Sequence, residues 1–152
     1  MARQVRLLVA DDHTLIRESL RQLFDIFPDL QVAGEAADGP DALVLLARGG
    51  IDLLLLDLRM PGLCGAALIS HIRRLYPDLP ILVLSIQNEA QIVVRALQAG
   101  ANGFVAKGQD AEILIDAIRE VALGKPFIDP AVAEALSTAA DMPAAGRQSP
   151  YL

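Results

Sequence analysis

Five short apolar runs recur along the chain, and a helical pattern follows each of them. The runs occupy residues 5–10, 31–37, 52–57, 81–85 and 103–107. After the first run, Ile16, Leu20 and Leu23 recur at the spacing of one helical face. Most of the runs are continuously apolar, which is typical of parallel strands covered on both faces. The pattern therefore predicts an α/β fold, a doubly wound (βα)5 domain whose parallel five-stranded sheet has the order 2-1-3-4-5.

The helical pattern of the fifth unit ends at Gly124, so we expect the main domain to span residues 1–125. Within the segment 126–138, Asp129 suits a helix cap and Pro130 a first helical turn. These residues predict a short C-terminal helix over 129–137. Residues 139–152 are rich in Ala, Pro, Gly and Ser, and we expect them to form a linker or a disordered tail.

Polar side chains end four of the five predicted strands. They are Asp11 and Asp12 after the first strand, Asp57 after the third, Ser85 after the fourth and Lys107 after the fifth. Because the carboxyl ends of parallel strands meet at one edge of the sheet, we expect these side chains to form a common site. Singly, Asp12 could be a helix cap and Lys107 half of a surface ion pair. The second strand lies at the outside of the predicted sheet and is expected to add nothing to the site.

Three carboxylates at one edge repel one another and call for a cation. Oxygen ligands suit Mg²⁺, and beside a metal one carboxylate can attack phosphorus and form an acyl phosphate. The ammonium of Lys107 and the hydroxyl of Ser85 can then stabilise the phosphoryl oxygens. The chain contains 11 Arg and only 2 Lys, and the compact charge of a lysine at position 107 suits a phosphate partner.

Charge and composition narrow the class of protein. The net charge of −6 and the lack of a basic stripe argue against nonspecific nucleic-acid binding. No apolar run approaches the length of a membrane span. The apolar run near the N-terminus stops after four residues, which is too short for a signal peptide. Cys64 is the single cysteine and cannot form an internal disulfide, which agrees with a reducing compartment. We expect a cytoplasmic protein with no membrane partner.

Four motifs, in this order and at these spacings, resemble a bacterial two-component response regulator receiver domain: "DD" at 11–12, "LLLLDLRMPG" at 53–62, "LS" at 84–85 and "GFVAK" at 103–107. The resemblance covers about residues 5–124 and implies a flavodoxin-like fold. It implies that Asp57 is the phosphoacceptor and that Lys107 pairs with the phosphoryl group. It further implies Mg²⁺ ligands at Asp11, Asp12, Asp57 and the backbone carbonyl of Arg59, and switch residues at Ser85 and Phe104.

The stretches "VADDHTLIRESL", "GEAADGPDAL" and "GANGFVAK" resemble the NarL/FixJ subclass, whose receivers usually precede a LuxR-type helix-turn-helix. The resemblance implies a sensor histidine kinase as phosphoryl donor and control of transcription as output, and we also expect a homodimer. DNA would then be bound only through a C-terminal domain absent from this chain. We expect a receiver separated from a longer regulator, and a natural stand-alone receiver is the alternative.

The last two helical segments are more apolar than one buried face requires. In the fourth segment Ile92, Val93 and Val94 are consecutive, so at least one of them points away from the sheet. In the fifth, Ile113 and Ile115 flank the stripe formed by Leu114 and later apolar residues. Two alternatives remain: packing against the helix at 129–137, or a dimer face that responds to Ser85 and Phe104.

Three positions depart from the common receiver pattern. Gly108 follows Lys107 where most receivers have a proline, and we predict a trans bond there because a cis bond before a non-proline residue costs about 3–4 kcal/mol. Ile86 follows Ser85 where many receivers have a small residue, so it is predicted to narrow access to Asp57 and to slow phosphoryl exchange. Cys64 is expected to be a plain small side chain, since no neighbouring cation in the sequence would lower its pKa.

Two other functions compete with a phosphorylation switch. A Mg²⁺-dependent phosphohydrolase of the haloacid-dehalogenase type requires a second acid two residues after its nucleophile, and Arg59 occupies that position. A degenerate receiver that acts only as an interaction module is the other alternative: the full set of site residues argues against it, and Ile86 and Gly108 leave it open. We therefore expect no enzyme activity beyond phosphorylation and dephosphorylation of the chain's own Asp57.

Overall fold

One parallel sheet organises the chain in a computed structural model that describes residues 3–140, with side chains described through residue 138. The strand order is β2-β1-β3-β4-β5-β6, and every neighbouring pair is parallel. The strands are β1 Val5–Ala10, β2 Leu30–Ala36, β3 Leu53–Leu56, β4 Ile81–Ser85, β5 Gly103–Ala106 and β6 Phe127–Ile128. The α/β flavodoxin-like architecture is as predicted.

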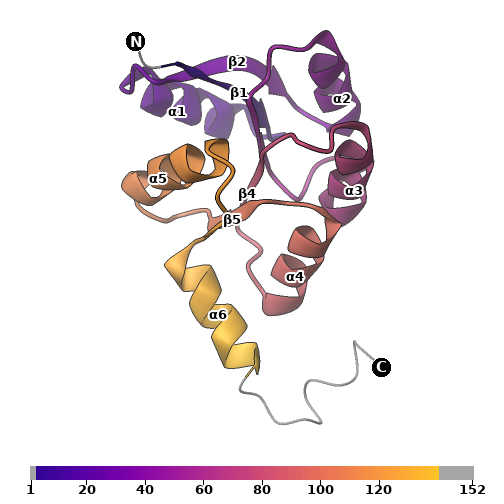
Figure 1. Ribbon diagram of the computed structural model, residues 1–152, viewed down its shortest axis with the longest axis vertical. Helices are drawn as coiled ribbons and strands as arrows, with labels where there is room; N and C mark the ends of the chain where they lie inside the picture. The colour runs from indigo at the N-terminus through magenta and orange to yellow at the C-terminus, as the bar shows by residue number, and fades with distance from the viewer. Residues whose placement is uncertain (1–2, 141–152) are drawn as a thin grey trace.

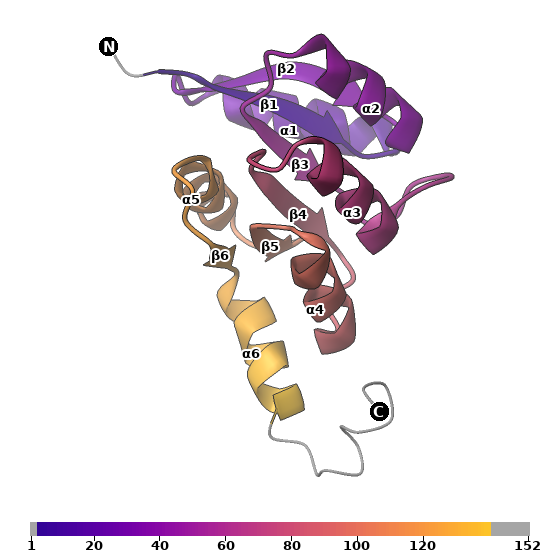
Figure 2. The same cartoon turned by 45° about the vertical axis from the view of Figure 1, so that its right-hand side comes forward.

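Helices cover both faces of the sheet. They are α1 Thr14–Asp25, α2 Gly39–Arg48, α3 Gly65–Leu75, α4 Ala90–Ala99, α5 Ala111–Ala122 and α6 Pro130–Ala140. Figures 1 and 2 show α1 and α5 on one face and α2, α3 and α4 on the other, with α6 beyond β6 and beside α4. Each face has its own buried apolar cluster. None of these helices is long and apolar enough to cross a bilayer within the described part of the chain.

The sixth strand corrects the predicted five-strand order. Phe127 and Ile128 pair with Gly103 and Phe104 of β5. Asn102 and Phe104 accept the flanking hydrogen bonds, from Phe127 N at 3.3 Å and from Asp129 N at 3.0 Å. Two residues are too few to show any strand periodicity, so the sequence pattern missed β6. Its place beside β5 is possible because Gly103 has no side chain: a Cβ there would lie 2.8 Å from the carbonyl oxygen of Phe127.

The C-terminal helix α6 packs against α4, as one of the two alternatives for the excess apolar residues of that segment predicted. Val132 of α6 is fully buried, and Leu136 packs on the cluster that includes Val93 and Ala96 of α4. Ile92 and Leu97 belong to the same apolar group. Part of the excess apolar surface of α4 is therefore covered by α6. The predicted tail begins at residue 139, but residues 139 and 140 belong to α6; the rest of it, from residue 141 onward, lies outside the described residues.

Candidate functional site

Three strand ends place buried polar side chains at one edge of the sheet. Asp11 directly follows β1 and is 2% exposed, and Asp57 directly follows β3 and is 4% exposed. Ser85, the last residue of β4, is fully buried. The ladder sets these positions, because Asp57 N donates to the carbonyl of Ala10 at 2.9 Å and Lys107 N to that of Ser85 at 2.8 Å. The sheet thus places Asp11, Asp57 and Ser85 at the same edge, as the strand-end pattern predicted.

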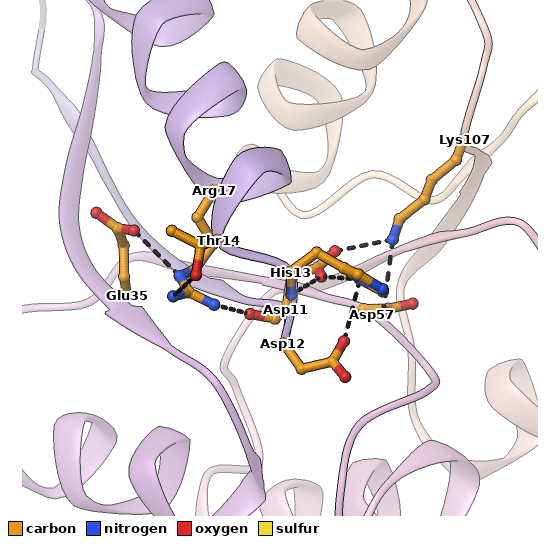
Figure 3. Close-up of polar contacts among 8 residues, drawn as sticks. All are labelled: Asp11, Asp12, His13, Thr14, Arg17, Glu35, Asp57 and Lys107. Atoms are coloured by element: carbon orange, nitrogen blue, oxygen red, sulfur yellow. Dashed lines mark hydrogen bonds and ion pairs between the residues drawn. The ribbon is translucent and has the colours of Figure 1, made fainter.

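The side chain of Lys107 reaches from the end of β5 into the carboxylates (Figure 3). Its Nζ donates a hydrogen bond to Asp11 Oδ2 at 2.8 Å and lies 3.5 Å from Asp57 Oδ2. The lysine side chain is 14% exposed, so water screens these contacts only weakly. The Lys107 ammonium is therefore held mainly by Asp11, and its contact with Asp57 is the weaker one.

The two buried carboxyls have pKa values displaced in opposite directions. Burial raises the pKa of Asp57; the charge of Asp11 adds to this rise, and the charge of Lys107 opposes it. Burial alone would also raise the pKa of Asp11, but hydrogen bonds from Lys107 and His13 outweigh it and hold that pKa below its usual value. Burial therefore disfavours the charged form of Asp57, whereas hydrogen bonds favour the charged form of Asp11.

Four side chains could hold a metal ion. Asp11, Asp12, His13 and Asp57 each offer a ligand atom, and these atoms lie within 4.8 Å of one another. Three of the donors are carboxylates, and hard oxygen ligands are those that Mg²⁺ prefers. Sequence reasoning missed His13, whose Nδ1 lies 3.0 Å from Asp11 Oδ1 and 3.1 Å from Asp12 Oδ1 (Figure 3). The donor set fits a divalent cation.

A cavity of about 510 Å³ opens beside the cluster. Its lining residues come from the loops after β1, β3, β4 and β5, and are Asp12, His13, Asp57, Arg59, Met60, Pro61, Cys64, Ile86 and Lys107. Ile86 is 66% exposed and lines the same cavity as Asp57. It therefore lies where a bulky side chain can narrow access to Asp57, although the predicted slower exchange stays a prediction. Phe104, by contrast, is fully buried in the core and does not line the cavity.

Two other sequence expectations meet the structure near this cavity. No cis peptide bond occurs in the described part of the chain, so the bond between Lys107 and Gly108 is trans as predicted. Gly108 has a φ of +92°, a left-handed conformation that favours glycine. The Ser85 Oγ accepts a hydrogen bond from Gln87 N at 3.0 Å, which turns the hydroxyl toward the loop after β4.

An ion-pair network behind Asp11 corrects the expectation that the second strand adds nothing to the site. Arg17 of α1 donates through Nη1 to the carbonyl oxygen of Asp11 and through Nε to Glu35 Oε1 at 3.2 Å. Glu35 lies on β2, and Arg21 pairs with its other oxygen. Figure 3 shows Arg17 and Glu35 on the side of Asp11 away from Lys107. An acid inside an apolar strand was the available sequence signal, but only the sheet order shows what it contacts.

Comparisons with known proteins agree with this geometry. The family model for the response regulator receiver domain matches residues 7–119. The nitrate/nitrite response regulator protein NarP of Escherichia coli is 37% identical over 119 residues, which are 78% of this chain and 55% of NarP. The chain therefore spans about half the length of that relative.

Two solved structures share the fold. A LuxR-family two-component response regulator from Aurantimonas sp. superposes with a TM-score of 0.85 at 30% identity, over 89% of this chain and 96% of that one. An RcsB response regulator–DNA complex gives a TM-score of 0.83 at 28% identity, over 88% and 68% of the two chains. The family model, the relatives and the strand-end cluster agree, and this chain belongs to the response regulator receiver domain family of two-component systems, with relatives of the NarL and LuxR type.

Proposed function

We propose that the chain is a phosphorylation switch that accepts a phosphoryl group on Asp57. The observation that carries this proposal is the position of Asp57: a buried carboxylate at the wall of an open cavity, with a lysine 3.5 Å from Oδ2. Its neighbour Asp11 already holds that lysine by a hydrogen bond of 2.8 Å. Asp57 therefore has an oxygen available for reaction, and a cation beside it to receive the new negative charge.

In this reaction a phosphoryl group moves from a phosphohistidine to Asp57, where it forms an acyl phosphate. An oxygen of Asp57 attacks the phosphorus of a phosphohistidine, the P–N bond breaks, and the leaving imidazole nitrogen takes up a proton. Lys107 is placed to bind a phosphoryl oxygen, and the Ser85 hydroxyl, whose oxygen accepts from Gln87 N, keeps its own proton as a second donor. Hydrolysis reverses the switch: water attacks phosphorus, the P–O bond to Asp57 breaks, the carboxylate is restored and inorganic phosphate is released.

Mg²⁺ is the cofactor that this donor set fits. Asp11, Asp12 and Asp57 would hold it, with the carbonyl of Arg59 as a further oxygen ligand. When bound, the metal offsets the charge of the carboxylates and of the incoming phosphoryl group. Asp11, whose pKa is held below its usual value, accepts hydrogen bonds and holds no proton for the reaction.

The partners follow from the family. We infer that the donor is a sensor histidine kinase, that the protein acts in the cytoplasm and that the active form is a homodimer. RcsB, one of the structural relatives, is seen in complex with DNA, and we infer that this chain controls transcription through a DNA-binding domain outside it. Ser85 and Phe104 would carry the change of state toward that output.

Two rivals make different predictions in one experiment. The chain is incubated with Mg²⁺ and acetyl phosphate, and its intact mass is followed together with release of inorganic phosphate. A single phosphoryl adduct per chain that is absent in Asp57→Asn supports the proposed function. Repeated turnover of small phosphomonoesters would favour a phosphohydrolase, and no adduct under any condition would favour a degenerate interaction module.

A further inference from the structure

Asp129, where α6 begins, is a fully buried carboxylate outside the cluster described above. Oδ2 accepts a hydrogen bond from Ala106 N at 2.9 Å. Oδ1 accepts two, from Gln109 Nε2 at 2.5 Å and from Ala131 N at 2.8 Å. All three donors are amide N–H groups. A buried acid with this many donors is held in one position.

Two of the three contacts go to the segment that carries the site lysine. Ala106 immediately precedes Lys107, and Gln109 follows it by two residues. The backbone N–H of Asp129 adds a bond to the carbonyl of Phe104 at 3.0 Å. Asp129 therefore contacts the residues 104–109 at three points, on both sides of Lys107. We call these three contacts the Asp129 clasp.

A helix cap alone does not account for these contacts. Capping α6 requires one side-chain oxygen near its first amides, and the bond from Ala131 N supplies it. An exposed serine would do the same, without the cost of burying a carboxylate. The bonds from Ala106 N and Gln109 Nε2 do not contribute to the cap. Their common effect is to tie the start of α6 to the loop after β5.

We propose that Asp129 is a positioning residue that couples the docking of α6 to the phosphorylation site. The clasp holds the backbone beside Lys107, so that the ammonium points into the carboxylates, and it fixes α6 against α4 through Val132 and Leu136. Coupling between two sites is reciprocal: if docking of α6 favours the phosphorylated state, phosphorylation favours docking of α6 by the same factor. This inference rests on the proposed function.

The test separates the clasp from the cap. In Asp129→Ser the shorter side chain keeps one oxygen that can cap α6, but it has no second oxygen for Ala106 N. Asp110→Ser is the matched control, because Asp110 caps α5 without any side-chain hydrogen bond and is exposed. Gln109→Ala removes a single donor and gives a milder variant in case Asp129→Ser does not fold.

Two measurements test the coupling, one at the phosphorylation site and one at α6. The first is the rate of adduct formation with Mg²⁺ and acetyl phosphate, read by intact mass. Because Lys107 is then less firmly positioned beside Asp57, we expect this rate to fall about 5-fold or more in Asp129→Ser, by a smaller factor in Gln109→Ala, and not in Asp110→Ser. The second is amide hydrogen exchange of α6 with and without Mg²⁺ and beryllofluoride. We expect beryllofluoride to slow this exchange about 5-fold or more in the unaltered chain, and to leave it unchanged in Asp129→Ser.

The outcomes distinguish this inference from the proposed function. If the unaltered chain forms no adduct, the proposed function fails. If the unaltered chain forms the adduct, but Asp129→Ser and Gln109→Ala form it at the same rate and beryllofluoride leaves α6 exchange unaltered, the coupling is overturned and Asp129 is only a cap.

Discussion

Replacing Asp57 by Asn should make the metal-free protein more stable. The carboxylate of Asp57 is buried and its pKa is raised, chiefly by burial, so its charged form is disfavoured by the fold. Asparagine has nearly the same shape and carries no charge. Its oxygen can still accept from Lys107, and its amide can donate to Asp11. The substitution thus removes the cost of the charge and retains the packing.

The contacts of Asp57 set the size of the effect. At an effective dielectric constant of about 20, charges on Asp57 and Asp11 no more than 4.8 Å apart repel by at least about 3.5 kcal/mol. Lys107 at 3.5 Å attracts by about 4.7 kcal/mol. Asp12, which is one-third exposed and screened by water, adds a smaller repulsion. These charge terms nearly cancel, so burial decides the sign. We expect a gain of about 1–2 kcal/mol, the scale of burying an incompletely paired polar group.

Urea unfolding in the presence of a chelator measures this gain, with the exposed Asp25→Asn as the charge-matched control. Adding Mg²⁺ should narrow the difference, because metal at ten times its Kd stabilises the unaltered chain by about 1.4 kcal/mol. Asp57→Asn has one carboxylate ligand fewer and should gain less. An unchanged or lower stability of Asp57→Asn in chelator would refute the argument that burial decides the sign.

The pH dependence follows from the direction of the same shift. The folded pKa of Asp57 lies above the ordinary value of 3.8, so across that interval the folded state binds more protons than the unfolded state. The unaltered chain therefore loses stability as pH rises through this interval, whereas Asp57→Asn does not. The difference in the free energy of unfolding between the two proteins should reach its full size above the folded pKa of Asp57. It should disappear as pH falls below 3.8.

Three further substitutions test contacts away from the phosphoacceptor, each by urea unfolding. Arg17→Met should lower the free energy of unfolding by about 1–3 kcal/mol, because Glu35 Oε1 and the carbonyl oxygen of Asp11 lose the donor that Arg17 supplies. Arg119→Gln should cost no more than about 1 kcal/mol at neutral pH, since its pair with Asp29 is partly exposed. Hydrogen bonds from Arg119 lower the pKa of Asp29, so that contribution is present above 3.8 and is lost as pH falls through the folded pKa. Gly103→Ala should cost about 1–3 kcal/mol, because the new Cβ would lie 2.8 Å from a carbonyl oxygen of β6.

Each of these predictions has a contrary result. Unchanged stability in Arg17→Met would mean that the network behind Asp11 contributes nothing to the fold. A cost of Arg119→Gln that persists in strong acid would place its origin in packing, not in the ion pair. A neutral Gly103→Ala would mean that β6 moves away from β5 without cost.

The strand ends could be located from sequence because the rule behind them is local. A continuously apolar run identifies a parallel strand, and the residue after it must lie at the carboxyl edge of the sheet. This rule alone predicts that Asp57 and Lys107 lie close together. It could not tell which carboxylate the lysine binds, and the structure gives Asp11 the shorter contact. The choice depends on side-chain geometry across three strands, which no spacing along the chain encodes.

Other features depend on which elements become neighbours. β6 has only two residues and no pattern of its own, so it forms because β5 offers it a free edge beside Gly103. Glu35 meets Arg17 only after α1 has packed against β2. Asp129 was recognised as a helix cap, but its bond to Ala106 N joins residues 23 apart in the chain. Each of these contacts is a consequence of the tertiary fold.

The position of the phosphoryl group is the most direct test of the account. The chain is phosphorylated with Mg²⁺ and acetyl phosphate, reduced with borohydride, digested and sequenced by tandem mass spectrometry. Reduction converts the acyl phosphate of an aspartate to homoserine, which marks the residue that carried it. The account predicts homoserine at position 57 and at no other aspartate. Homoserine at position 11 or 12, or a chain that acquires none, would contradict it.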